Sequence, residues 1–167
     1  VSTGTSDNCG IASITLSATS FNCSNVGPNS VILTVTDVNG NSSTCGTTVI
    51  VLDSIAPVAS CNNLTLQLNP NGQAGIGTND VNNGSSDACG IANMVLSTTA
   101  FSCANVGMNN VVLTVTDVNG LASTCTSQVL VQDNVAPVAN CQNLTLVLNG
   151  SGQVTTSASS VNNNSTD

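Results

Sequence analysis

The stretch VVLTVTDVNG at residues 111–120 decides the fold of this chain. Val111, Leu113 and Val115 stand at every second position, which is the pattern of a β-strand with one buried face. An Asn-Gly dipeptide ends the stretch, and this pair favours a tight hairpin turn because both residues accept positive φ angles. The stretch therefore predicts a long strand that turns back into a second strand at 122–132.

The same stretch occurs 80 residues earlier, as VILTVTDVNG at residues 31–40. The whole chain repeats with this period and without insertion or deletion, and 45 of the 80 positions are identical between residues 1–80 and 81–160. A fixed internal period indicates an array of structural modules. Enzymes seldom consist of near-identical tandem modules, whereas stalks, filaments and adhesins often do.

The rest of the repeat also consists of short predicted strands. Alternating apolar residues predict strands at 64–68, 73–78 and 91–97, with a turn at 69–72 and a loop at 82–87. No stretch shows the 3.6-residue apolar period of an amphipathic helix. We therefore expect an all-β fold of tandem immunoglobulin-like β-sandwich modules. The two aromatic residues, Phe21 and Phe101, share one slot of the repeat and are expected in the core.

Proline marks the boundary between modules. An apolar run that ends at Asp53 is followed by Ala56-Pro57, and its copy by Ala136-Pro137. Proline has no N–H to donate to a strand ladder, so it marks the end of pairing. We therefore expect part of one module at 1–55, a complete module at 56–135 and part of a following module at 136–167, cut from a continuous array. These ranges are called the first, middle and last segments below.

Composition excludes several classes of function. The chain has no Lys, Arg or His, and its eight Asp give a net charge of −8. Such a charge opposes binding to nucleic acid and to anionic membrane surfaces. No apolar run is long enough to span a bilayer, so we expect no membrane insertion. The common catalytic bases are missing, so no Ser–His or Cys–His pair can form and we expect no enzyme.

Eight cysteines keep the 80-residue register. The equivalent pairs are Cys9 and Cys89, Cys23 and Cys103, Cys45 and Cys125, and Cys61 and Cys141. An even number of cysteines per repeat, without a Cys-x-x-Cys pair or a histidine, indicates structural disulfides rather than zinc sites. Disulfides in turn indicate an oxidising, extracellular compartment. A module of this size buries little apolar area, so covalent staples add useful stability.

Four cysteines per module allow three pairings, and strand geometry favours one of them. Cys61 opens the first strand of the module and Cys125 opens the last. In an immunoglobulin-like sandwich these two strands can lie side by side and parallel. We therefore predict a Cys61–Cys125 bond across the module.

The remaining cysteines follow from this choice. Cys89 and Cys103 bracket the third strand and are predicted to pair. Cys9 and Cys23 are predicted to pair in the copy before. The two cysteines left over for neighbouring modules are Cys45 and Cys141. In a filament, residues 136–167 of one copy would then complete residues 1–55 of the next.

Seven of the eight aspartates fall in repeated slots, and two interpretations stay open. Aspartate, asparagine and backbone oxygens are ligands that Ca²⁺ prefers. The same side chains also cap turns by accepting backbone N–H groups. The candidate calcium ligands are Asp37, Asn39, Asp117, Asn119, Asp53 and Asp133. Calcium is the only cofactor that the sequence leaves open.

Several short motifs together resemble a known module. They include Ser86-Asp87-Ala88-Cys89-Gly90, Val115-Thr116-Asp117-Val118-Asn119-Gly120 and the terminal Ala136-Pro137. The chain resembles the hyalin-repeat (HYR) module along its whole length, in particular the HYR-like arrays of Bacteroidota surface proteins. These arrays include gliding-motility adhesins exported by the type IX secretion system. Cys103 and the lack of basic residues depart from the generic module.

The resemblance implies an immunoglobulin-like fold, a cell-surface location and a role in adhesion or spacing. We therefore expect structural stalk or shaft repeats of a secreted bacterial surface adhesin, with neighbouring repeats as partners. One alternative is a self-assembling subunit of an extracellular filament. Another is a calcium-dependent module that binds surface glycans or a protein partner.

Overall fold

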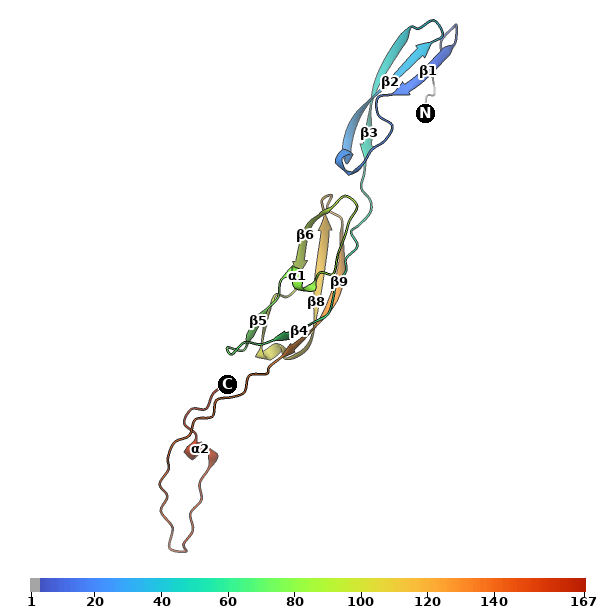
Figure 1. Cartoon of the computed structure of the whole chain (residues 1–167). Helices are drawn as coiled ribbons and strands as arrows, with labels where there is room; N and C mark the ends of the chain where they lie inside the picture. Colours follow the sequence, from blue (N-terminus) through green and yellow to red (C-terminus); the bar gives the residue numbers. More distant parts are fainter. Residues whose placement is uncertain (1–3) are drawn as a thin grey trace. The chain divides into compact units, whose positions relative to one another are not determined.

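The computed structural model describes residues 4–167 (Figure 1). The first three residues of the predicted segment 1–55 lie outside the described residues. Contacts divide the chain into two compact units, one made of 1–61, 82–95 and 113–125, the other of 62–81, 96–112 and 126–167. The units combine separate stretches of chain, so they do not coincide with the three predicted segments, whose limits stay a prediction.

The first unit contains a three-stranded antiparallel sheet. Its strands are β1 (Ile11–Leu16), β2 (Gly27–Asp37) and β3 (Ser42–Val51), in the spatial order β1-β2-β3. The hairpin of β2 and β3 is in register from Gly27 opposite Val51 to Thr36 opposite Ser42. A short 3₁₀ turn, Cys23–Asn25, precedes β2. In this sheet β3 is an edge strand, so one side of its backbone pairs with no strand of the described residues.

The middle segment builds a four-stranded sheet in the order β4-β9-β8-β6. The strands are β4 (Leu64–Gln67), β6 (Ile91–Leu96), β8 (Gly107–Asp117) and β9 (Ala122–Gln132). By the 80-residue repeat, β6, β8 and β9 correspond to β1, β2 and β3. The added strand, β4, runs parallel to β9, with Leu64 opposite Val129 and Gln67 opposite Gln132. This parallel pair joins the first and last strands of the module, as in an immunoglobulin-like sandwich.

A smaller sheet and short helical turns complete the middle segment. Strands β5 (Gln73–Gly75) and β7 (Ala100–Ser102) pair antiparallel. Helix α1 (Thr78–Val81) and a 3₁₀ turn at Cys103–Asn105 connect the strands. The predicted all-β sandwich is therefore confirmed, and the sequence missed only β7 and these single turns.

Branched side chains of the two long strands form the core. Val111, Leu113 and Val115 of β8 are fully buried, and Val129 and Val131 of β9 meet them with at most 1% of their surface exposed. The predicted inward face of both strands is therefore confirmed. Phe101 of β7 is 4% exposed, as predicted for a core residue.

The last segment contains helix α2 (Ala158–Val161) and, among the described residues, no strand. Residues 143–146 read Asn-Leu-Thr-Leu, as do residues 63–66. The copy at 63–66 supplies most of β4, because β9 offers it a partner. The same sequence at 143–146 stays irregular, so partner availability decides whether it becomes a strand.

None of the helices in residues 4–167 has the length and the hydropathy that crossing a bilayer requires.

Candidate functional site

The predicted bond across the middle segment is present. Cys61 and Cys125 form a disulfide with Cα atoms 5.8 Å apart. Nearby, the Ser127 hydroxyl donates to the Asn62 carbonyl at 2.7 Å, and the Gln128 N–H donates to Asn63 Oδ1 at 2.8 Å. These contacts bring the chain alongside β9 just before β4 begins.

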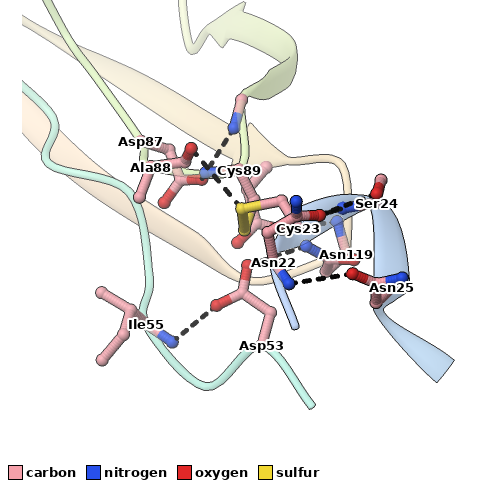
Figure 2. The surroundings of a disulfide bond; sticks show 12 residues. Asn22, Cys23, Ser24, Asn25, Asp53, Ile55, Asp87, Ala88, Cys89 and Asn119 are labelled. Carbon is pink, nitrogen blue, oxygen red and sulfur yellow. Dashed lines mark hydrogen bonds between the residues drawn. A yellow bond between two sulfur atoms is a disulfide. The ribbon is translucent and has the colours of Figure 1, made fainter. Parts of the chain in front are cut away.

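The second bond differs from the prediction and joins two repeats. Cys23 is bonded to Cys89, with Cα atoms 5.1 Å apart and 66 residues between them in the sequence (Figure 2). The predicted pairs Cys9–Cys23 and Cys89–Cys103 are therefore wrong. Cys23 belongs to the first segment and Cys89 to the middle segment, so the bond spans the linker after β3.

Strand length explains the error. Cys89 and Cys103 lie before and after β6, which contains six residues. A strand of this length spans about 20 Å, whereas bonded cysteines have Cα atoms at most about 7 Å apart. Residues that bracket an extended strand therefore lie near its opposite ends. Gly90 accepts from Val118 beyond the end of β8, while Cys103 Sγ lies 3.7 Å from the Gly72 carbonyl.

The linker beside the Cys23–Cys89 bond is held by side-chain contacts. Asp53 Oδ1 accepts the Ile55 N–H at 3.1 Å, and its Oδ2 accepts Asn119 Nδ2 at 2.7 Å. Further along, the Ser123 hydroxyl donates to the Pro57 carbonyl. Pro57 is buried. The linker is therefore fixed by hydrogen bonds as well as by the covalent bond (Figure 2).

Asp87 shapes the loop that presents Cys89. Its Oδ1 accepts the N–H groups of Cys89 at 2.7 Å and of Gly90 at 3.0 Å. Gly90 has φ of 109°, which an L-residue with a side chain rarely adopts. This loop places Asp87 near Asp53, and a ligand atom from each of Asp53, Asp87 and Cys89 lies within 4.8 Å of the others. Cys89 Sγ is committed to the disulfide, so two carboxylates and the Asn119 amide remain for a cation.

Of the six candidate calcium ligands, the structure brings together Asp53 and Asn119. The other aspartates cap local turns: Asp37 Oδ1 accepts the N–H groups of Asn39 and Asn41, each at 2.8 Å. Asp117 does the same for Asn119 at 2.9 Å and Leu121 at 2.8 Å. Asp133 Oδ1 accepts the Val135 N–H at 3.0 Å, as Asp53 does in its own linker. Calcium binding stays a prediction.

One difference between the repeats changes the environment of the turn aspartate. Asn41 Nδ2 donates to Asp37 Oδ2 at 2.8 Å. Leu121 replaces this asparagine in the second copy, and the buried Asp117 Oδ2 has no hydrogen-bond partner. The Asn41 side chain, followed by its backbone N–H, lowers the pKa of Asp37 below its ordinary value.

Replacing Asn41 with Leu, the residue of the second copy, should raise the pKa of Asp37 toward its ordinary value. A lowered carboxyl pKa stabilises the fold above the unfolded-state pKa, and this stabilisation is lost as the pH falls through the folded-state pKa. N41L should therefore lose less stability than the wild type on acidification. A carboxyl ¹³C NMR titration of Asp37 measures the shift, and an unchanged pKa would contradict this explanation.

Four cysteines are free and exposed within residues 4–167: Cys9, Cys45, Cys103 and Cys141. Each is the repeat counterpart of a bonded cysteine. The local structures match as well, since Asp7 Oδ1 accepts the Cys9 N–H at 2.8 Å, as Asp87 does for Cys89. Likewise Asn105 Oδ1 accepts the Ser102 N–H at 2.9 Å, as Asn25 does for Asn22.

Sequence reasoning missed three parts of this site: the Cys23–Cys89 bond, Asp87 and Ser123. The signal for the bond was the register itself, because Cys23 and Cys89 stand in the slots of Cys103 and Cys9. A bond between these two slots in successive repeats uses the same register as a bond within one repeat. Only the lengths of the strands between the slots distinguish the two.

Comparison with known proteins adds one structure. No family model and no curated protein matches the chain. A protocadherin gammaB7 EC3-6 cis-dimer structure is similar at 18% sequence identity with a TM-score of 0.38. The match covers 89% of this chain and 47% of that chain, so this chain spans about half of that chain's length.

Proposed function

We propose that these repeats form the stalk or shaft of a secreted surface adhesin, with neighbouring repeats as their partners. The observation that carries this proposal is the Cys23–Cys89 bond, which links one repeat to the next across the linker. A linker closed in this way cannot lengthen freely under load. A stalk that holds a binding tip away from a cell requires this property.

The site chemistry supports a structural role. The bond, the Asp53–Asn119 contact and the Ser123–Pro57 contact all restrain the linker, and none of them presents a nucleophile beside a base. The chain contains no His, Lys or Arg for acid–base catalysis. We therefore propose a mechanical function and no catalytic one.

Disulfides support an extracellular location, because they persist in oxidising compartments. The resemblance to HYR-like arrays of Bacteroidota surface proteins supports a bacterial adhesin, including one of the gliding-motility type. The Asp53–Asp87 pair is the feature that favours a calcium-dependent version of the same linker. Binding of surface glycans has no comparable contact in its support.

Stretching single chains by their ends in optical tweezers tests the mechanical proposal. The two disulfides close overlapping loops, so full extension should gain about 250 Å on reduction, because about 70 hidden residues are released at roughly 3.3–3.6 Å each. The C23S/C89S variant should reach about 30–40 Å further than the wild type before reduction, since about 10 more residues are free to extend. Equal lengths with and without reductant would contradict a load-bearing role.

A further inference from the structure

The sheet of the first segment has an open edge where the middle segment has a strand. In the middle segment β4 lies beside β9, and in the first segment nothing among the described residues lies beside the equivalent edge of β3. Exposed edges with unpaired backbone groups readily accept another strand. The face that such a strand would cover is also incomplete. Leu33 and Val49 are half-buried, whereas their counterparts Leu113 and Val129 are fully buried.

The last segment carries the missing strand. Residues 143–146 repeat the sequence of residues 63–66, which includes most of β4. Leu144 and Leu146 are each 43% exposed and Leu148 is 62% exposed, while Leu68, the counterpart of Leu148, is 5% exposed. The open edge of β3 and this unpaired apolar segment are therefore the two halves of a contact that the middle segment already makes.

The free cysteines agree with this contact. Cys61, just before β4, is bonded to Cys125 of β9. Their counterparts are Cys141, just before the unpaired segment, and Cys45 in β3. Cys103 and Cys9 are in turn the counterparts of the bonded Cys23 and Cys89. A single head-to-tail arrangement therefore provides a partner for each of the four free thiols.

We propose that this chain binds a second copy of itself head to tail, and that residues 136–167 of one copy complete the sandwich of residues 8–55 of the next. Residues 144–147 add to β3 as a parallel strand, with Leu144 opposite Val49 and Leu146 opposite Val51, as Leu64 and Leu66 stand opposite Val129 and Val131. The contact joins two different surfaces, so it does not close on itself and copies continue to add in a row.

Two disulfides then seal each junction, Cys141 to Cys45 and Cys103 to Cys9 of the next copy. Each bond forms by thiol–disulfide exchange with a small disulfide such as oxidised glutathione. One thiol takes up one glutathione as a mixed disulfide and releases the other. The second thiol then displaces the bound glutathione, so two protein thiols are oxidised and one glutathione disulfide becomes two thiols.

Mixed isotope labelling tests the arrangement on the whole chain. Equal amounts of ¹⁴N and ¹⁵N chain are refolded together with oxidised glutathione and digested by a protease that cuts before aspartate. Cys45 then lies in peptide 37–52 and Cys141 in peptide 133–166, while Cys61 lies in 53–79 and Cys125 in 117–132. We expect 37–52 linked to 133–166 with one light and one heavy member. We expect 53–79 linked to 117–132 only in matched labels.

A matched pair of substitutions tests the strand contact without the disulfides. Leu66 is half-buried and Gln67 is exposed in β4, so the proposal places Leu146 in the core of the junction and Val147 on its surface. In reduced chain, L146D should abolish the species above 16.5 kDa in light scattering, and V147D should keep them. Val147 is the more exposed of the two, at 83% against 43%, so nonspecific apolar association predicts the opposite order.

Circular dichroism verifies that both variants keep the β-sheet content of the wild type. The proposal is overturned if the 37–52 and 133–166 peptides carry only matched labels, or if V147D disrupts association as strongly as L146D. A chain that stays at 16.5 kDa under both reducing and oxidising conditions also overturns it.

Discussion

Replacing Cys61 and Cys125 with serine should lower the free energy of unfolding of the middle segment by about 4 kcal/mol, because their bond closes a loop of 64 residues in the unfolded chain. Small domains have a total stability of about 5–15 kcal/mol. The variant should therefore lose most of its margin, with a much lower melting temperature. Calorimetry under oxidising conditions measures the change.

The matched control for this variant is C9S/C103S, which removes two free, exposed thiols. Exposed substitutions away from such features usually change stability by about 0.5 kcal/mol or less. The control should therefore melt with the wild type at a concentration where the chain is monomeric. A C61S/C125S variant that also melts with the wild type would show that the parallel β4–β9 pair needs no staple.

Breaking the Cys23–Cys89 bond should expose the linker to proteolysis before Asp53. In the wild type Asp53 is half-buried and hydrogen-bonded to Asn119, while the equivalent Asp133 is exposed. An aspartate-directed protease should therefore cut before Asp133 roughly tenfold or more faster than before Asp53, since about 1.4 kcal/mol of restraint corresponds to tenfold. In C23S/C89S the two rates should become similar.

The two linkers form an internal control, because both contain an aspartate two residues before an aliphatic residue and Ala-Pro. Their aspartates make the same local turn, at 3.1 Å to the Ile55 N–H and 3.0 Å to the Val135 N–H. Local sequence alone therefore predicts equal cleavage. Equal rates in the wild type would mean that the bond does not restrain the linker in solution.

Most of the strands could be predicted from the sequence because their signals are local. The alternation at Val111, Leu113 and Val115 and the Asn-Gly turn after them defined the β8–β9 hairpin, and the same residues are buried in the structure. Strand β7 was missed because three residues are too few to show a period. The Cys61–Cys125 bond followed from the topology, since parallel first and last strands bring their starts together.

The junction between repeats could not be predicted in the same way. Cys23 and Cys89 are 66 residues apart and contact one another only after two segments have folded. The aspartates illustrate a second limit, because Asp37 and Asp117 have the same neighbours in sequence except for Asn41 and Leu121. That single difference leaves Asp117 Oδ2 buried without a partner. The turn cap follows from the local sequence, and its energetic state follows from one distant backbone-directed choice.

The central claim is that a disulfide joins one repeat to the next, and peptide mapping without reductant tests it most directly. In the C9S/C103S variant, cleavage before aspartate places Cys23 in peptide 7–36 and Cys89 in peptide 87–116, with no other cysteine in either. The structure predicts one covalently linked 7–36/87–116 species that separates on reduction. Two separate peptides with free thiols before reduction would contradict it.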